Sequence, residues 1–249
     1  MLLRTEGICK HFGGLRAVDG VDFTLKEGQL KSIIGPNGAG KTTLFNLIAG
    51  VYRPTAGKVF FRDRDITRLS LHQTSRLGIT KTYQITQIFP GLTVFENVRI
   101  AAQSRVSAFN FWRSTHSFAP LNERALEILR QVELLEKRNW LASTLSHGER
   151  RYLEIGIALA TEPQVLLLDE PTAGMSVAET AMCAGLIRRL NRELRLSIVL
   201  VEHDMSVVMG ISEEILVLNE GRVLAEGTPR EVSDNREVQR VYLGEEKYA

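Results

Sequence analysis

The chain has few of the features that mark disulfide-rich, membrane-spanning or nucleic-acid-binding proteins. Its only cysteines, Cys9 and Cys183, lie far apart and show no C-x-x-C spacing, so we expect two reduced thiols rather than a disulfide framework. The formal net charge of +2 is too small for a polyanion-binding surface, and we expect no nucleic-acid partner. No window approaches the ~18 consecutive apolar residues of a spanning helix, and the N-terminus lacks the apolar core of a signal peptide. We therefore expect a chain that is soluble by itself, although a membrane-bound partner is not excluded.

Three apolar runs indicate a central parallel sheet. They read "KSIIG", "QVLLLDE" and "LSIVLVEHD", and helical patterns separate them. Strands that are buried on both faces lack polar alternation, as these runs do. The last part, "EILVLNEGRVLAEG", predicts a hairpin around residues 219–221.

The remaining sequence adds two further regions to this sheet. Residues 1–34 predict short strands interrupted by turns at Gly13-Gly14, Asp19-Gly20 and Glu27-Gly28. Between about residues 85 and 160, "LTVFENVRIAAQSR" and "PLNERALEILRQVELLEK" carry apolar residues at helical spacing. We interpret this stretch as a helical insertion within an α/β core.

A phosphate-binding loop follows the first apolar run. "GPNGAGKTT" has the G-x-x-x-x-G-K-[ST] pattern after a strand and before a helical run, which is the context that this motif requires. Glycines let the backbone approach the phosphates closely, and the N–H groups at the start of the helix face the anion. Lys41 supplies positive charge to the β- and γ-phosphates, and the Thr42 hydroxyl is suited to bind Mg²⁺. The predicted nucleotide-binding residues of this loop are Gly35, Asn37, Gly38, Ala39, Gly40, Lys41, Thr42 and Thr43.

Polar residues that follow the other two runs complete a hydrolytic site. Because ligands bind beyond the carboxyl ends of parallel strands, Asp169 and Glu170 should meet the nucleotide there. We predict that Asp169 binds Mg²⁺ through water and that Glu170 orients and deprotonates the attacking water. His203, after the third run, is predicted to bind the γ-phosphate. An acidic pair that begins a solvated loop and a structural histidine are the alternatives.

Five motifs together resemble the nucleotide-binding subunits of ABC transporters. They are "GPNGAGKTT", Gln84 in "TYQITQIFP", "LSHGE", "VLLLDEP" and His203 in "VEHD". The resemblance covers almost the whole chain. It implies an α/β fold, in which a P-loop NTPase core with a mainly parallel central sheet carries an N-terminal antiparallel β-subdomain and an inserted α-helical subdomain. The expected division is a single ATPase domain over residues 1–249, with the core at 1–84 and 161–249 and the helical signature subdomain at about 85–160.

The resemblance also assigns further site residues. In that family two subunits face each other head to tail, so Ser146 and Gly148 would contact the γ-phosphate held by a partner subunit. Ser146-x-x-Glu149 is at the same time a capping box for its own helix. Phe12 occupies the place of the aromatic residue that stacks on adenine, with a core phenylalanine as the alternative. Gln84 matches the glutamine that reaches Mg²⁺ and the attacking water.

Two departures from the family pattern limit these assignments. The common signature Leu-Ser-Gly-Gly-Gln has His147 and Glu149 at its third and fifth positions here, so contacts of those positions with a partner are not assigned. Ser176 stands where the family often has an aspartate that couples the two sites, and that role is not transferred to it.

The resemblance implies an ATP-binding and ATP-hydrolysing subunit of a bacterial importer. The stretch "GITKTYQITQIFPGLTVFENV" and the C-terminal tail are most similar to the branched-chain amino acid class, and "LSHGE" with "AGM" leans toward its urea and short-chain amide relatives. The implied partners are a second ATPase subunit, identical or related, two integral-membrane permease subunits and, indirectly, a periplasmic or extracellular solute-binding protein. The expected location is the cytoplasmic face of the inner membrane. A P-loop small-molecule kinase and a cassette ATPase acting on ribosomes or nucleic acid are the alternatives.

Overall fold

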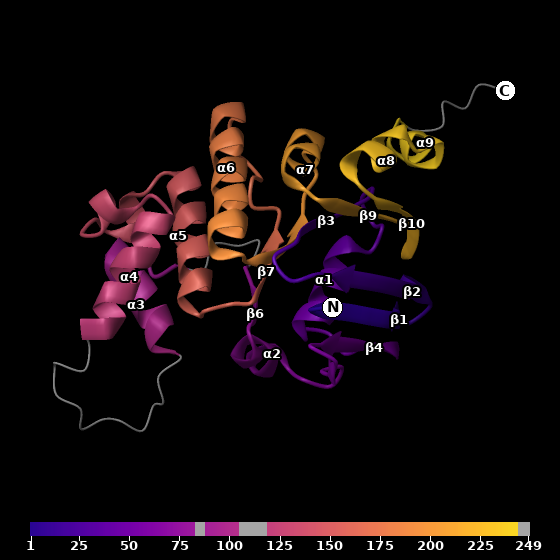
Figure 1. The fold of residues 1–249 in the computed structure, drawn as a ribbon, viewed down its shortest axis with the longest axis horizontal. Helices are drawn as coiled ribbons and strands as arrows, with labels where there is room; N and C mark the ends of the chain where they lie inside the picture. The colour runs from indigo at the N-terminus through magenta and orange to yellow at the C-terminus, as the bar shows by residue number, and fades with distance from the viewer. Residues whose placement is uncertain (83–87, 105–118, 244–249) are drawn as a thin grey trace.

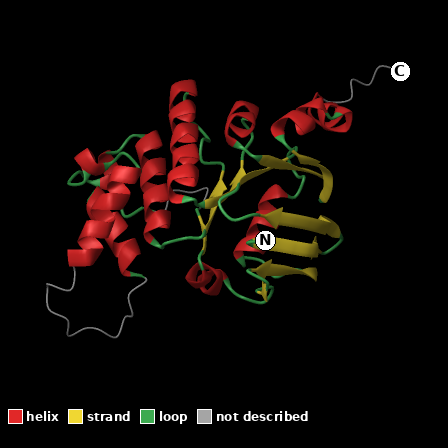
Figure 2. Cartoon of the chain, in the orientation of Figure 1, coloured by secondary structure: helices red, strands yellow, loops and turns green. Residues whose placement is uncertain are grey.

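The structure is a computed structural model that describes residues 1–82, 88–104 and 119–243. Its described part contains a larger and a smaller β-sheet, with helices packed on both faces of the larger one (Figure 1). Figure 2 shows that the helices labelled α3 and α4 in Figure 1 lie apart from the strands, at one end of the molecule. The α/β class predicted from the sequence is confirmed.

The larger sheet is almost entirely parallel. Its strand order is β10-β9-β3-β8-β7-β6, and within it the pair β9–β10 is antiparallel. The three apolar runs form β3, β8 and β7 at its centre, and every residue of these three strands is buried. The predicted C-terminal hairpin is present as β9 and β10. The bounds are β3 (Leu30–Ile34), β6 (Ile79–Lys81), β7 (Val165–Asp169), β8 (Ser197–Val201), β9 (Glu214–Asn219) and β10 (Arg222–Gly227).

The smaller sheet is antiparallel and has the order β2-β1-β4-β5. Its strands are β1 (Leu3–Phe12), β2 (Leu15–Leu25), β4 (Ala56–Phe61) and β5 (Arg64–Asp65). Gly13-Gly14 forms the predicted turn between β1 and β2. The turn predicted at Asp19-Gly20 is wrong, because both residues lie inside β2. There the pairing shifts from Ile8↔Val21 to Lys10↔Val18, so the positive φ of Gly20, +70°, is accommodated as an irregularity within a continuous strand.

The described helices include α3 and α4, which correspond to the two helical patterns predicted between about residues 85 and 160. None of the helices in the described ranges is long and apolar enough to cross a bilayer. The bounds are α1 (Lys41–Ala49), α2 (Leu71–Leu77), α3 (Val94–Gln103), α4 (Ala119–Gln131), α5 (His147–Ala160), α6 (Val177–Leu194), α7 (Met205–Ile211), α8 (Pro229–Asp234) and α9 (Arg236–Leu243), with short 3₁₀ turns at Leu135–Lys137 and Ala142–Thr144.

Alternating side chains of β7 belong to two separate cores. On β7, Val165 and Leu167 pack in the core that contains α1 and the smaller sheet, whereas Leu166 and Leu168 pack in the core that contains α5 and α6. Successive residues of a strand point to opposite faces, so both layers are attached to the same backbone. Helix α1 therefore lies between the two sheets (Figure 1), and its first residue, Lys41, is fixed relative to the end of β7.

Candidate nucleotide site

The loop between β3 and α1 needs glycine at two positions for steric reasons. A Cβ atom on Gly35 would lie 2.2 Å from the carbonyl oxygen of Leu218, and one on Gly40 would lie 2.3 Å from that of Ala17. Gly40 also caps α1 in the left-handed region, with φ of +98°. Backbone atoms of the neighbouring strands thus lie so close to this loop that only glycine fits at these two positions.

Lys41 is directed back over the loop that precedes it. Its Nζ atom donates hydrogen bonds to the carbonyl oxygens of Gly35, at 2.7 Å, and Pro36, at 3.0 Å. Burial lowers the pKa of Lys41, while the carboxylates of Glu170 and Asp169 act in the opposite direction. The two carbonyl groups hold the ammonium group at the loop, where its positive charge can bind a phosphate.

The loop opens into a pocket of about 520 Å³ that collects most of the residues predicted from the sequence. It brings together parts of the chain that lie more than 150 positions apart, since Phe12 and His203 both line it. The described residues that line the pocket are Phe12, Leu15, Arg16, Ala17, Asn37, Gly38, Ala39, Gly40, Lys41, Thr42, Thr43, Glu170, His203 and Glu220.

The two consecutive carboxylates lie in different environments. Asp169 is the last residue of β7 and is 3% exposed, whereas the next residue lines the pocket. Glu170 has left the strand conformation, with φ of +48°, and its N–H donates to the carbonyl oxygen of Val201 at 2.8 Å. The difference in position between the two carboxylates comes from this turn in the backbone.

No local sequence pattern predicts that a lysine contacts Asp169. Lys81, at the end of β6, places its Nζ 3.4 Å from Oδ2 of Asp169, and both side chains are almost fully buried. Burial raises the pKa of Asp169, and the Lys81 ammonium opposes that rise. Lys81 also donates to the side-chain oxygen of Asn46 on α1 at 2.5 Å. A surface lysine at the end of a short strand would have shown the same local pattern.

His203 and Glu170 contact each other at the pocket. Nε2 of His203 lies 2.8 Å from Oε1 of Glu170, and the histidine side chain is 46% exposed. The two residues come from loops that follow β8 and β7, which are neighbours in the sheet. His203 therefore lies at the pocket, and the alternative of a buried structural histidine is wrong.

Phe12 lies at the pocket and not in a core. Its side chain is 45% exposed, which excludes the core alternative. Its ring packs edge to face on Tyr52 with the centroids 5.6 Å apart, and the Lys10 ammonium lies 5.1 Å from its centroid. An exposed ring held by two neighbours offers a surface on which a planar base can stack.

Ser146 and Gly148 lie at the start of α5 and do not line the pocket of their own chain. The predicted capping box is present: the Glu149 N–H donates to Oγ of Ser146 at 3.3 Å, and the Ser146 N–H donates to Oε2 of Glu149 at 3.0 Å. Gly148 is buried, and a Cβ on it would lie 3.4 Å from Oε1 of Glu179 on α6. Gln84, predicted to reach Mg²⁺ and water, lies outside the described residues.

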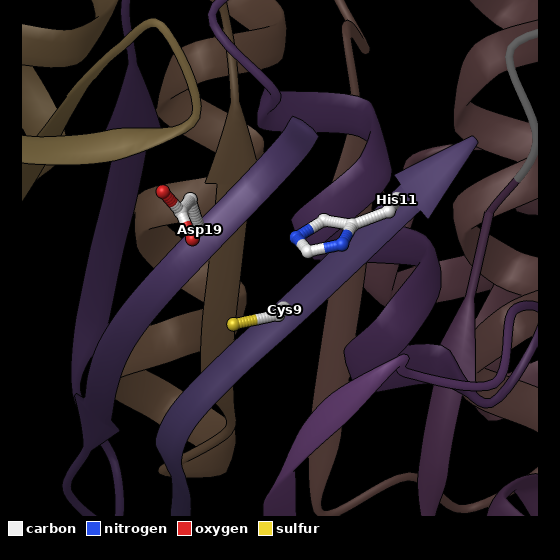
Figure 3. Close-up of side chains that lie close together, drawn as sticks. All are labelled: Cys9, His11 and Asp19. Atoms are coloured by element: carbon white, nitrogen blue, oxygen red, sulfur yellow. The ribbon is translucent and has the colours of Figure 1, made fainter. Parts of the chain in front are cut away.

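A separate group of possible metal ligands lies on the smaller sheet. The ligand atoms of Cys9, His11 and Asp19 lie within 4.8 Å of one another (Figure 3). Nε2 of His11 has no described hydrogen-bond partner. However, Oδ2 of Asp19 already accepts from Arg222, at 2.8 Å, and Arg16 lies 3.5 Å from the same oxygen. Because two guanidinium groups would repel a cation there, we assign no metal to this group.

Comparison with known families identifies the class of protein that carries this site. Residues 18–173 match the family model described as "ABC transporter", and residues 222–248 match "Branched-chain amino acid ATP-binding cassette transporter". The first match covers well over half of the chain, so the chain belongs to the ABC transporter family, in agreement with the motifs. It is the ATP-binding and ATP-hydrolysing subunit of such a transporter, as predicted.

Individual relatives align over nearly the whole chain. The high-affinity branched-chain amino acid transport ATP-binding protein LivG of Escherichia coli K12 is 42% identical, with 98% of each chain covered, and BraF of Pseudomonas aeruginosa is 41% identical with the same coverage. The lipopolysaccharide export ATP-binding protein LptB of Escherichia coli K12 is 33% identical. Among solved structures, the ADP conformation of the cassette MJ1267 is 30% identical, covers 98% of this chain and 99% of that one, and has a TM-score of 0.86.

Replacing Phe12 tests the stacking surface. Phe12→Ala should raise the Kd for ATP roughly 5- to 150-fold, because base stacking on an aromatic ring contributes about 1–3 kcal/mol, and should raise the Kd for GTP similarly. Phe12→Trp should bind both nucleotides like the unaltered protein. Fluorescent-nucleotide titration measures these affinities. An unchanged Kd in Phe12→Ala would show that the ring does not contact the base.

Proposed function

We propose that the pocket binds ATP across the loop before α1 and hydrolyses it with Glu170 and His203. The observation that carries this proposal is the 2.8 Å contact between these two side chains at a pocket that is also lined by Lys41 and Thr42. The pocket joins the groups that bind the phosphates to a carboxylate and an imidazole suited to proton transfer. A kinase of small molecules would use the loop equally well, but the family assignment leaves that reading without support.

In the proposed reaction, Glu170 accepts a proton from water as the water oxygen bonds to the γ-phosphorus. The bond between the γ-phosphorus and the bridging oxygen breaks, which yields ADP and inorganic phosphate. His203 exchanges its contact with Glu170 for a hydrogen bond to the γ-phosphate, and this exchange releases the carboxylate for water. Lys41 stabilises the charge on the phosphate oxygens throughout.

Mg²⁺ fits the residues present. The Thr42 hydroxyl and the Asp169 carboxylate offer the oxygen ligands that this ion prefers. Asp169 is buried and bound by Lys81, so its contact to the ion would pass through water, as predicted from the sequence. Bound Mg²⁺ would neutralise charge on the β- and γ-phosphates. Gln84 keeps its proposed role at the ion and the water.

We further propose that two cassettes share each nucleotide, with Ser146 and Gly148 of one subunit at the phosphates held by the other. The placement of both residues outside the pocket of their own chain supports this, as does the solved dimer of the cassette MJ0796, described as bound to ADP and phosphate after hydrolysis. The helix start of α5 offers N–H groups and a positive dipole end to an anion.

The proposed cellular role is to energise uptake of branched-chain amino acids. LivG and BraF, at 42% and 41% identity, and the C-terminal match over residues 222–248 support this cargo over urea or short-chain amides. The proposed partners are two integral-membrane permease subunits, which dock on the helical subdomain at about residues 85–160, and indirectly a solute-binding protein. The cassette then lies on the cytoplasmic face of the membrane.

Glu170→Gln tests the hydrolytic role. The amide cannot accept a proton, so kcat should fall at least ~100-fold, while the Kd for ATP changes by less than about twofold. Sedimentation should show dimers with ATP and monomers without it. Glu220→Gln is the matched control, because it makes the same chemical change in another carboxylate of the pocket. Exclusively monomeric Glu170→Gln with ATP would contradict the mechanism.

Ser146→Arg tests the shared site. Added to a fixed amount of unaltered protein, this variant should lower the total ATPase activity, because mixed dimers place an arginine at the phosphate held by the unaltered subunit. Ser143→Arg introduces the same charge three residues earlier, in front of the helix, and should not inhibit. If the activity of the unaltered subunits stays constant at every ratio of variant to unaltered protein, the proposal that two subunits share each nucleotide is wrong.

Uptake in cells tests the cargo. Deletion of the gene should reduce uptake of radiolabelled leucine at submicromolar concentration roughly tenfold or more, and the unaltered gene but not Glu170→Gln should restore it. Uptake of labelled urea should not change. Loss of urea uptake alone would move the protein to the amide class, and normal uptake of both solutes with a defective outer membrane would indicate an export role.

A further inference from the structure

A buried carboxylate lies directly beside the hydrolytic residues without lining their pocket. Glu202 follows β8, precedes His203, and is 4% exposed. Its Oε1 accepts hydrogen bonds from the N–H of Thr172, at 2.9 Å, and from the Thr172 hydroxyl, at 2.6 Å. Its Oε2 accepts from the N–H of His203 at 3.0 Å. A carboxylate buried to this extent is stable only with such donors, so its position is well determined.

These bonds connect the two loops that carry the hydrolytic side chains. Thr172 belongs to the loop that follows β7 and lies two residues after Glu170. His203 belongs to the loop that follows β8. Glu202 belongs to the same loop as His203, so its two bonds to Thr172 join that loop to the loop of Glu170, and its bond to the His203 N–H fixes the carboxylate within its own loop.

The loop of Glu170 needs such support because its backbone is strained. The residue before a proline is normally restricted to an extended conformation, yet Glu170 precedes Pro171 and has φ of +48°. Strained residues persist where the surroundings fix them. Two contacts supply this support. The N–H of Glu170 itself donates to the carbonyl oxygen of Val201, and Thr172, two residues later, donates to Glu202.

We propose that Glu202 is a positioning residue for hydrolysis, which fixes Glu170 and His203 relative to each other in the arrangement that the reaction requires. This inference rests on the roles proposed above for Glu170 and His203. Glu202 itself is not among the described residues that line the pocket, so it should affect the rate of the chemical step and not the binding of ATP.

Two variants each remove one hydrogen bond of this connection. Thr172→Val keeps the shape of the side chain and the backbone N–H but removes the hydroxyl bond to Oε1. Thr172→Ser restores that hydroxyl and serves as the conservative control. Glu202→Gln keeps an oxygen for Thr172 but places an amide N–H₂ against the N–H of His203, where a second donor cannot be accepted.

Thr172→Val and Glu202→Gln should each lower kcat about tenfold or more, the effect of losing a hydrogen bond to a charged group. The KM and the Kd for ATP should change by less than about twofold, and Thr172→Ser should retain kcat within about threefold. The affinity for inorganic vanadate in the presence of MgADP should fall in proportion to kcat, because vanadate replaces the phosphate of the transition state.

Three results would overturn the inference. They are a kcat of Thr172→Val equal to that of Thr172→Ser, a loss of ATP affinity as large as the loss of kcat, or the absence of a cooperative thermal unfolding transition in Thr172→Val, which would make the contact structural only. Failure of the proposed function is distinguishable, because it would appear as substantial turnover in Glu170→Gln.

Discussion

The parallel register of β3, β8 and β7 is the constraint on which the site depends. Val201, the last residue of β8, pairs with Ile33 on one side and with Asp169 on the other. The strands therefore end at one edge of the sheet, and the loops beginning at residues 35, 170 and 202 leave it together. Parallel strands place their ligands at this edge. A one-residue slip of β7 would exchange the faces of its side chains and separate Glu170 from His203.

The convergence of these loops also brings buried charged side chains close together. Lys41 is bound by carbonyl groups, Asp169 lies beside Lys81, and Glu202 accepts three hydrogen bonds. An isolated buried charge costs far more free energy than a paired one. Each charge is thus fixed by specific partners, and the same partners fix the geometry of the pocket. Rigid placement of charge is what stabilises a phosphoryl-transfer transition state without reorganisation.

Local patterns predicted the strands, the loop before α1 and the acidic end of β7, because each is specified within a few consecutive residues. Contacts that depend on register could not be predicted in this way. The pairing of Lys81 with Asp169 requires β6 to lie beside β7, and the contact of Glu202 with Thr172 requires two loops 30 positions apart to meet. Asp19-Gly20 shows the converse error: a local turn signal was outweighed by pairing along the whole length of β1 and β2.

The capping role of Ser146 is compatible with a second role toward a partner subunit, for a chemical reason. A hydroxyl group has two acceptor sites and one proton. In the cap, Oγ accepts from the N–H of Glu149, which occupies a lone pair and leaves the proton to be donated outward. Glu149 is held in turn by Lys137, which counters its negative charge near the helix start. The glutamate that departs from the family pattern therefore orders the serine without neutralising the helix end that an incoming phosphate would contact.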